Sequence, residues 1–159
     1  MAPKMAKVPS PEFHYELANL WLDETVQYAN IICPRGHGKT SVIGTIIPLH
    51  HIIFDKGSKM ILICSKTQGH SISILSQIKQ IFYNNKFKYM FGDWTEATAK
   101  TWSKNEVILK DNTRIVCRGT GQQIRGIFHD WQRPSLVLLD DLEDGKNTRT
   151  EDAMNKNYE

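Results

Sequence analysis

The chain alternates short unbroken apolar runs with longer segments in which apolar residues recur every three or four positions. Unbroken runs of about five residues are typical of buried strands, and the longer spacing is typical of helices that pack on one face. The predicted strands are 29–33, 59–64 and 135–139. The predicted helices are 13–28, 39–53 and 68–83. Pro48 lies inside the second helix, where it predicts a kink or an early end.

A hairpin is predicted between the third predicted helix, 68–83, and the last predicted strand, 135–139. Residues 106–110 and 113–117 are both strand-like, and Asp111-Asn112 between them suits a two-residue turn. The polar segment 84–104 is expected to be loop with short helical pieces.

This alternation of strands and helices predicts an α/β fold with a mostly parallel sheet and helices on both faces. Ligands bind such sheets at the carboxyl ends of the strands. Two stretches with candidate binding or catalytic residues follow predicted strands, one after Cys33 and one after Leu139. They should therefore meet at one edge of the sheet.

Composition adds broad limits to this picture. The chain has 159 residues, 40% hydrophobic and 23% charged, with a net charge of +3. This fits one globular domain and permits nucleic-acid contact without arguing for it. Residues 1–11 are expected to be a loose arm, without the apolar core of a secretory signal, and no run is long enough to span a membrane. Cys33, Cys64 and Cys117 are expected to be small buried hydrophobes in a reducing compartment.

The segment CPRGHGKTS (33–41) has the ending of a phosphate-binding loop. Gly36 and Gly38 would let backbone N–H groups converge on a triphosphate at the start of a helix. Lys39 would contact the β- and γ-phosphates, and the Thr40 hydroxyl would bind Mg²⁺. Cys33 stands where the usual pattern has its opening glycine, and Arg35 adds a second cation. The alternative is a surface turn whose lysine is merely solvated.

The segment SLVLLDDLED (135–144) supplies the acidic half of such a site. Asp140 would hold Mg²⁺ through water, and either Asp141 or Glu143 would activate the attacking water. Because successive strand residues point to opposite faces, Asp140 and Asp141 can share the site only if the strand ends there. A solvated acidic turn and a metal-dependent nuclease site are the alternatives.

Two Arg-Gly pairs lie between these motifs, at Arg118 and at Arg125. An arginine can stabilise charge on a transferring phosphoryl group, in cis or in trans. Arg125 is the first candidate for such a finger and Arg133 the second, unless they brace the loop or contact DNA phosphates. At least one predicted strand separates the two motif strands, which fits RecA-like ATPases better than small GTPases.

Five stretches in this order resemble the N-terminal ATPase domain of the large terminase subunit of tailed bacteriophages, the motor that packages DNA into the prohead. Together they extend over roughly residues 12–145. The matching stretches are FHYELANL (13–20), CPRGHGKTS (33–41), ICSKTQGHSISILSQIK (63–79), GTGQQIRGI (119–127) and RPSLVLLDDLED (133–144).

The resemblance implies a three-layer P-loop NTPase of the RecA-like (ASCE) type that hydrolyses ATP with Mg²⁺. It implies double-stranded DNA, a portal protein and a small terminase subunit as partners, with assembly into a homo-oligomeric ring. It also implies a place in the host cytoplasm, transiently docked on the prohead.

The resemblance carries site residues over one by one. Arg35 matches the family's extra loop arginine and Asp140 its Mg²⁺ aspartate, whereas Asp141 stands where the family commonly has Glu. Phe13, His14 and Tyr15 match the region that flanks the adenine. The residues that match the loop are Cys33, Pro34, Arg35, Gly36, His37, Gly38, Lys39, Thr40 and Ser41.

Residues 12–159 would form the ATPase domain, without the coupling motif and the nuclease domain of a complete subunit. The chain is therefore expected to be a fragment that binds nucleotide but hydrolyses it slowly without a ring. Two other functions stay open. ICSKTQ (63–68) is also similar to a DNA-contacting segment of RecA-like helicases, and the altered loop would suit a non-catalytic nucleotide-binding module.

Overall fold

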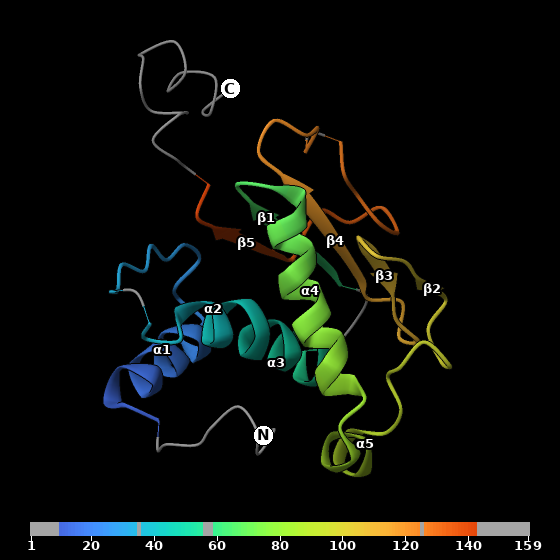
Figure 1. The fold of residues 1–159 in the computed structure, drawn as a ribbon, viewed down its shortest axis with the longest axis horizontal. Coiled ribbons are helices and arrows are strands. Elements are labelled where there is room, and N and C mark those ends of the chain that lie inside the picture. Colours follow the sequence, from blue (N-terminus) through green and yellow to red (C-terminus); the bar gives the residue numbers. More distant parts are fainter. Residues whose placement is uncertain (1–9, 35, 56–58, 125, 143–159) are drawn as a thin grey trace.

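The computed structural model describes residues 10–34, 36–55, 59–124 and 126–142, which form an α/β fold around one five-stranded mixed sheet (Figure 1). The strand order is β2-β3-β4-β1-β5. The strands are β1 (Met60–Ser65), β2 (Thr101–Trp102), β3 (Glu106–Ile108), β4 (Arg114–Gly119) and β5 (Leu136–Asp140).

The sheet is less parallel than predicted. Strand β1 pairs in parallel with β4 on one side and with β5 on the other, whereas β2 and β3 run antiparallel to their neighbours. The reason is local, because strands joined by a tight turn can only pair antiparallel. The parallel part of the sheet, β4-β1-β5, contains the acidic strand.

The predicted hairpin exists as β3 and β4, but its turn is longer than two residues. The amide of Leu109 donates to the carbonyl of Thr113 (2.9 Å), so three residues form the loop between them. Asn112 has φ 69°, and the left-handed residue of a three-residue hairpin loop commonly has such a value. Asp111 holds the loop by accepting bonds from the amide (3.0 Å) and hydroxyl (2.7 Å) of Thr113.

The first helix, α1 (Glu12–Leu22), ends six residues before the predicted boundary at Tyr28. The carboxylate of Asp23 accepts bonds from the amide (3.0 Å) and the hydroxyl (2.6 Å) of Thr25. Such a local side-chain bond offers the backbone an alternative to the helix and turns the chain away.

Residues 39–54 form one helical run that absorbs Pro48 without breaking. It consists of α2 (Lys39–Ser41), the π-helical η1 (Val42–Ile46) and α3 (Ile47–Phe54). Pro48 has no N–H to donate to the carbonyl of Gly44. The preceding amide, of Ile47, bonds to the carbonyl of Val42, five residues back, which is the π-helical pattern. The predicted kink is therefore a local π-helical shift in the hydrogen-bond register.

Two further helices follow β1. Helix α4 (Gln68–Phe82) confirms the predicted 68–83 and begins at Thr67, whose hydroxyl caps the amide of His70 (3.2 Å). Helix α5 (Asn85–Phe91) is one of the short pieces expected in 84–104, and the side chain of Asn84 caps it. Strand β2, in the same segment, has only two residues and was not predicted.

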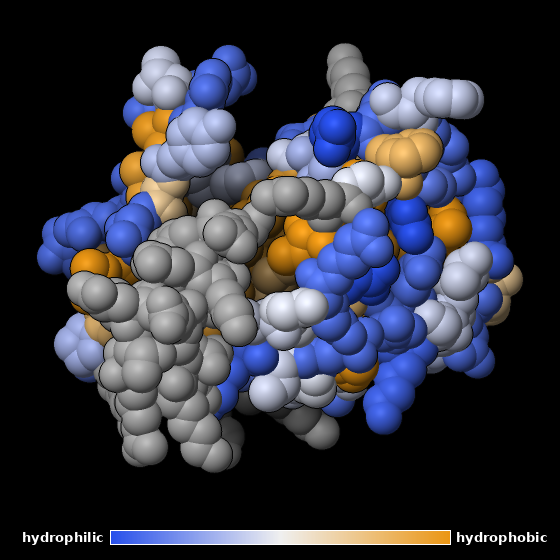
Figure 2. All heavy atoms as spheres, turned by 90° about the horizontal axis from the view of Figure 1, so that it is seen from above, coloured by the Kyte–Doolittle hydropathy of each residue, from blue (hydrophilic) through white to orange (hydrophobic). Residues whose placement is uncertain are grey.

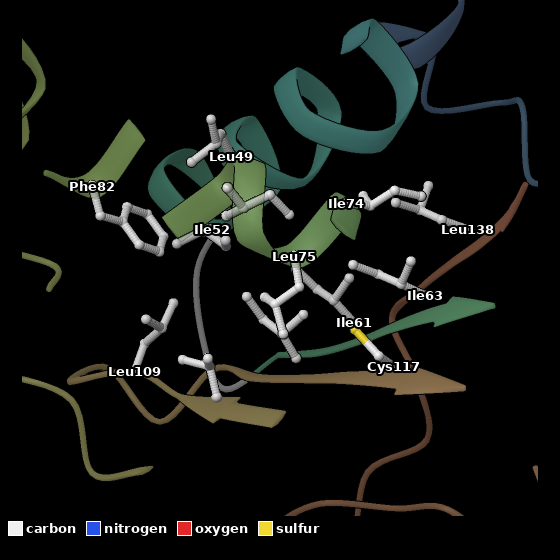
Figure 3. Close-up of a cluster of buried hydrophobic side chains, with 13 residues drawn as sticks. Leu49, Ile52, Ile61, Ile63, Ile74, Leu75, Phe82, Leu109, Cys117 and Leu138 are labelled. Atoms are coloured by element: carbon white, nitrogen blue, oxygen red, sulfur yellow. The ribbon is translucent and has the colours of Figure 1, made fainter. Parts of the chain in front are cut away.

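The main core lies between the sheet and the helices α3 and α4. In Figure 3 side chains of these helices point toward Ile61, Ile63 and Cys117 on the strands. Leu49 and Ile52 come from α3, and Phe82 from α4. Because successive strand residues face opposite sides, β1 also sends Met60, Leu62 and Cys64 to the other face.

That second face carries a smaller core, to which no described helix contributes. Val116 completes it, and Ile127 and Leu142 from the flanking segments pack against it. On β5, Val137 and Leu139 point the same way and remain 47% and 62% exposed. The predicted helices on both faces are thus found on one face only within the described residues.

The predicted strand at 29–33 is wrong. These residues adopt no regular structure, and Ile32 is 90% exposed. An apolar run forms a strand only where a neighbouring strand offers its hydrogen bonds. In the described residues β5 pairs with β1 on one side, and 29–33 does not pair on the other.

No described helix is both long and apolar enough to cross a membrane. Seen from above in Figure 2, the surface outside the undescribed residues is largely hydrophilic, with smaller hydrophobic patches between.

A buried histidine fastens the end of α3 to the start of β5. His51 bonds through Nδ1 to the carboxylate of Asp55 and through Nε2 to the Ser135 hydroxyl (2.8 Å). The Ser135 hydroxyl also contacts the amide of Met60 (3.3 Å), so the network reaches β1. Burial lowers the pKa of His51, although the nearby carboxylate of Asp55 opposes this shift.

This network makes stability depend on pH. His51 has a folded pKa below the unfolded value of about 6.5, so the unfolded chain binds the proton more tightly. The contribution is complete above that unfolded value and is lost as pH falls through it toward the folded pKa. We expect the urea concentration at the unfolding midpoint to decrease as the pH is lowered below about 6.5. The slope of this midpoint against pH should be smaller in His51→Gln. His50→Gln, which leaves His51 in place, should keep the slope; an unchanged slope in His51→Gln would contradict the assignment.

Candidate functional site

The structure brings the two predicted motifs together across most of the sequence. The Thr40 hydroxyl lies 3.5 Å from the carboxylate of Asp140, and the Lys39 ammonium lies 3.9 Å from that of Asp141. Both pairs meet at the carboxyl end of β5, which is the edge where the sequence placed them. The two motifs are therefore neighbours in space.

The acidic pair is held by the neighbouring strand β1. The Ser65 hydroxyl donates to the carbonyl of Asp140 (2.7 Å), and the Lys66 amide donates to that of Asp141 (3.2 Å). Strand β5 ends at Asp140, and Asp141 takes a left-handed conformation with φ 47°. The chain therefore leaves the strand between the two carboxylates, which satisfies the condition for both to face the loop.

Two glycines of the loop have conformations that other residues rarely adopt. Gly36 and Gly38 have φ 81° and 74°, in the region that favours glycine. Gly38 immediately precedes the helical run 39–54, and a side chain there would also crowd the ring of His14 (3.3 Å). The loop thus needs glycine at Gly38 for two independent reasons.

The start of α1 packs against this loop. The His14 ring bonds through Nε2 to the carbonyl of His37 (2.9 Å), and the rings of Phe13 and His37 have centroids 5.8 Å apart. Of the three residues that the resemblance placed near the adenine, Phe13 and His14 contact the loop, and Tyr15 is 62% exposed.

His70 is a site residue that sequence reasoning missed. Its Nε2 lies 3.7 Å from the Asp140 carboxylate, and it sits in the first turn of α4. The only signal in the sequence is its place after β1, whose carboxyl end adjoins that of β5. A histidine there can orient the carboxylate of Asp140, as groups behind a metal ligand commonly do.

The residues present fit a magnesium–nucleotide complex. A threonine hydroxyl and an aspartate carboxylate are hard oxygen ligands of the kind that Mg²⁺ takes together with phosphate oxygens. The Asp140 side chain is only 15% exposed, whereas that of Asp141 is 70% exposed. Within the described ranges no group of three His, Cys, Asp or Glu side chains could hold a metal ion unaided, so phosphate oxygens or water would have to complete the set.

Other predicted residues are not brought to the site or cannot be placed. Arg133 is exposed and precedes β5, so five strand residues, about 16 Å, separate it from the acidic end. It could act there only from a neighbouring subunit. Cys33 is half-buried, and Pro34 and Ser41 are exposed. Three further residues predicted to belong to the site lie outside the described residues. They are Arg35, Arg125 and Glu143.

A cavity of about 460 Å³ lies elsewhere, beside the end of β4. Among the described residues, none from the loop or the acidic end of β5 lines this cavity, so the cavity does not mark the candidate site. Its lining residues are Arg118, Gln122, Gln123, Gly126 and Ile127.

In comparisons with protein-family models and with curated proteins, no match to this chain was found.

The cysteines provide a probe of the site. Cys64 and Cys117 are buried, and burial raises the pKa of the Cys117 thiol to about 12. Cys33 is half-buried beside the loop. We expect one of the three thiols of the native protein to react readily with an aromatic disulfide reagent, and Cys33→Ser to abolish that reaction. Mg-ATP should slow the reaction of Cys33 severalfold if the loop closes on phosphate. An unchanged rate at saturating nucleotide would contradict phosphate binding by the loop.

Proposed function

We propose that this chain is the ATP-hydrolysing motor domain of a terminase large subunit, driving double-stranded DNA into a prohead. The observation that carries the proposal is the approach of Lys39 to Asp141 and of Thr40 to Asp140, which lies 100 residues further along the chain. The ordered resemblance of five segments supports the same function. The finer fold is proposed to be RecA-like, because β1 separates the two motif segments in sequence.

The residues of the site can divide the work of phosphoryl transfer. Lys39 binds the β- and γ-phosphates, and Gly36 and Gly38 let backbone amides approach them. Thr40 and Asp140 would hold Mg²⁺, which neutralises phosphate charge when bound. Asp141 faces the loop and is proposed to orient the attacking water, with Glu143 as the alternative.

Cations would stabilise the charge that develops on the phosphoryl group. Arg35 lies within the loop sequence, and Arg125 is proposed to act as a finger from a neighbouring subunit. A ring of subunits around duplex DNA, docked on a portal protein with a small terminase subunit, would supply that geometry. The complex would work in the host cytoplasm.

Two other functions make different predictions. A RecA-like helicase would separate DNA strands without packaging them. A non-catalytic module would bind ATP tightly with no turnover, even with DNA and the other motor subunits present. Either result would replace the motor proposal.

Lys39→Ala should weaken ATP binding about 10- to 100-fold, because a charge-assisted contact to phosphate is lost. Calorimetric titration with Mg-ATP measures this change. Lys86→Ala is the matched control, since Lys86 is an exposed lysine on α5. If Lys39→Ala binds ATP as tightly as the parent chain, the loop does not hold phosphate.

Arg125→Ala should reduce turnover by about 10³-fold or more in the assembled motor, while the affinity for ATP stays unchanged. Phosphate release from the complete motor on duplex DNA measures turnover, and Arg133→Ala is the comparison. A normal rate in Arg125→Ala together with a large loss in Arg133→Ala would reverse the assignment.

A further inference from the structure

Trp131 lies at the tip of a tight turn between β4 and β5 and is 96% exposed. His129 and Gln132 exchange backbone bonds across the turn, of 3.0 and 2.9 Å. The two central residues, Asp130 and Trp131, have φ 48° and 64°. Two successive left-handed residues are the mark of a type I′ turn, which favours Asn and Gly.

Tryptophan at this position is unfavourable for folding in two ways. A left-handed conformation is strained for a residue with a bulky side chain, and an exposed indole buries almost none of its apolar surface. Strained residues of this kind persist where the surrounding structure fixes them, often at sites of function. The indole therefore calls for an explanation outside the core.

The turn is fixed to the β3–β4 hairpin rather than left loose. The Asn112 side-chain amide donates to the Asp130 carboxylate, and the His129 ring bonds to the carbonyl of Asn112 (2.9 Å). The Arg114 guanidinium donates to the carbonyl of Phe128 (3.0 Å). A ligand that binds here would not have to order the backbone first.

A second ring accompanies the indole. Phe128 is 54% exposed, and its ring lies nearly parallel to that of Trp131, at 23° with centroids 6.4 Å apart. Two flat and accessible aromatic faces on this turn form a stacking platform, which we call the Phe128–Trp131 pair.

We propose that the Phe128–Trp131 pair binds an unpaired base of single-stranded nucleic acid by stacking. Every nucleobase has a flat face, and stacking on exposed aromatic side chains is the common means of holding single strands. The residues between and after the two rings, His129, Asp130, Gln132 and Arg133, are all polar, whereas the centre of a protein interface is apolar.

The charges around the turn also suit a polyanion. Arg133 is exposed two residues beyond the indole, and Lys100 reaches the turn through the side chain of Asn112 (2.9 Å). Asp130 adds a carboxylate to the turn, where it bonds to the Asn112 amide and lies 3.9 Å from His129 Nε2. The pair lies at the amino end of β5, away from Asp140, so base stacking and ATP binding would be separate properties.

Titration of the whole chain with a 12-residue oligothymidylate tests the proposal by tryptophan fluorescence. The other three tryptophans, Trp21, Trp94 and Trp102, are partly buried, so quenching reports mainly on Trp131. We expect Phe128→Ala and Trp131→Ala to bind roughly 10- to 100-fold more weakly, measured by anisotropy of a labelled oligonucleotide. Tyr89→Ala is the matched control, because Tyr89 is an aromatic residue on α5 that is 92% exposed. It should bind as the parent does.

Trp131→Gly distinguishes a binding role from a structural one. Glycine relieves the left-handed strain, so this variant should lose binding while its melting temperature rises by about 2–4 °C. Unchanged oligonucleotide affinity in Trp131→Gly would overturn the proposal, as would a melting temperature that falls. If Trp131→Ala weakens binding of a 12-base-pair duplex as much as that of oligothymidylate, the pair does not act by stacking on an unpaired base. A protein that occupies the pair while oligothymidylate does not bind would assign the surface to that class of partner instead.

Discussion

The parallel pairing of β1 with β5 is the constraint on which the candidate site depends. Its register places Ser65 beside Asp140, and the two bonds that β1 donates there hold the end of β5 and the turn at Asp141. A shift of one residue would turn every side chain of β5 to the other face of the sheet. Leu138 would leave the main core, and Asp140 would no longer face Thr40. Folding of the core and assembly of the acidic site are therefore one event, enforced by the same buried apolar side chains.

Much of this arrangement follows from local pattern. The helix 68–82, the strand 60–65 and the acidic strand were recognisable because their apolar spacing agrees with their final burial. The place of the two aspartates at a carboxyl end followed from the rule that ligands gather at that edge of parallel strands, whereas Lys39 and Thr40 reach it without the strand predicted before them. The position of the acidic residues could therefore be predicted from strand polarity, and that of the loop residues from their motif alone.

The failures share a physical cause as well. Residues 29–33 are apolar enough for a strand, but pairing depends on a neighbour that local pattern does not reveal. The end of α1 depended on one side chain, Asp23, that competes for backbone bonds. His70 was missed because only the distance between α4 and β5, a tertiary property, makes it part of the site. Trp131 was overlooked for a similar reason, since its strained turn is visible only in the backbone.

The helical run 39–54 and strand β5 touch at both ends. Thr40 meets Asp140 at one end, and His51 meets Ser135 at the other. Eleven helical steps and five strand steps each cover about 16 Å, so the two elements match in length and act as a braced pair. Because the helical run and β5 are in contact at two points, neither can shift along the other at one end alone. If the loop moves along the helix axis, the His51–Ser135 contact, the π-helical turn η1 or strand β5 must move as well. The two elements therefore couple opposite edges of the sheet.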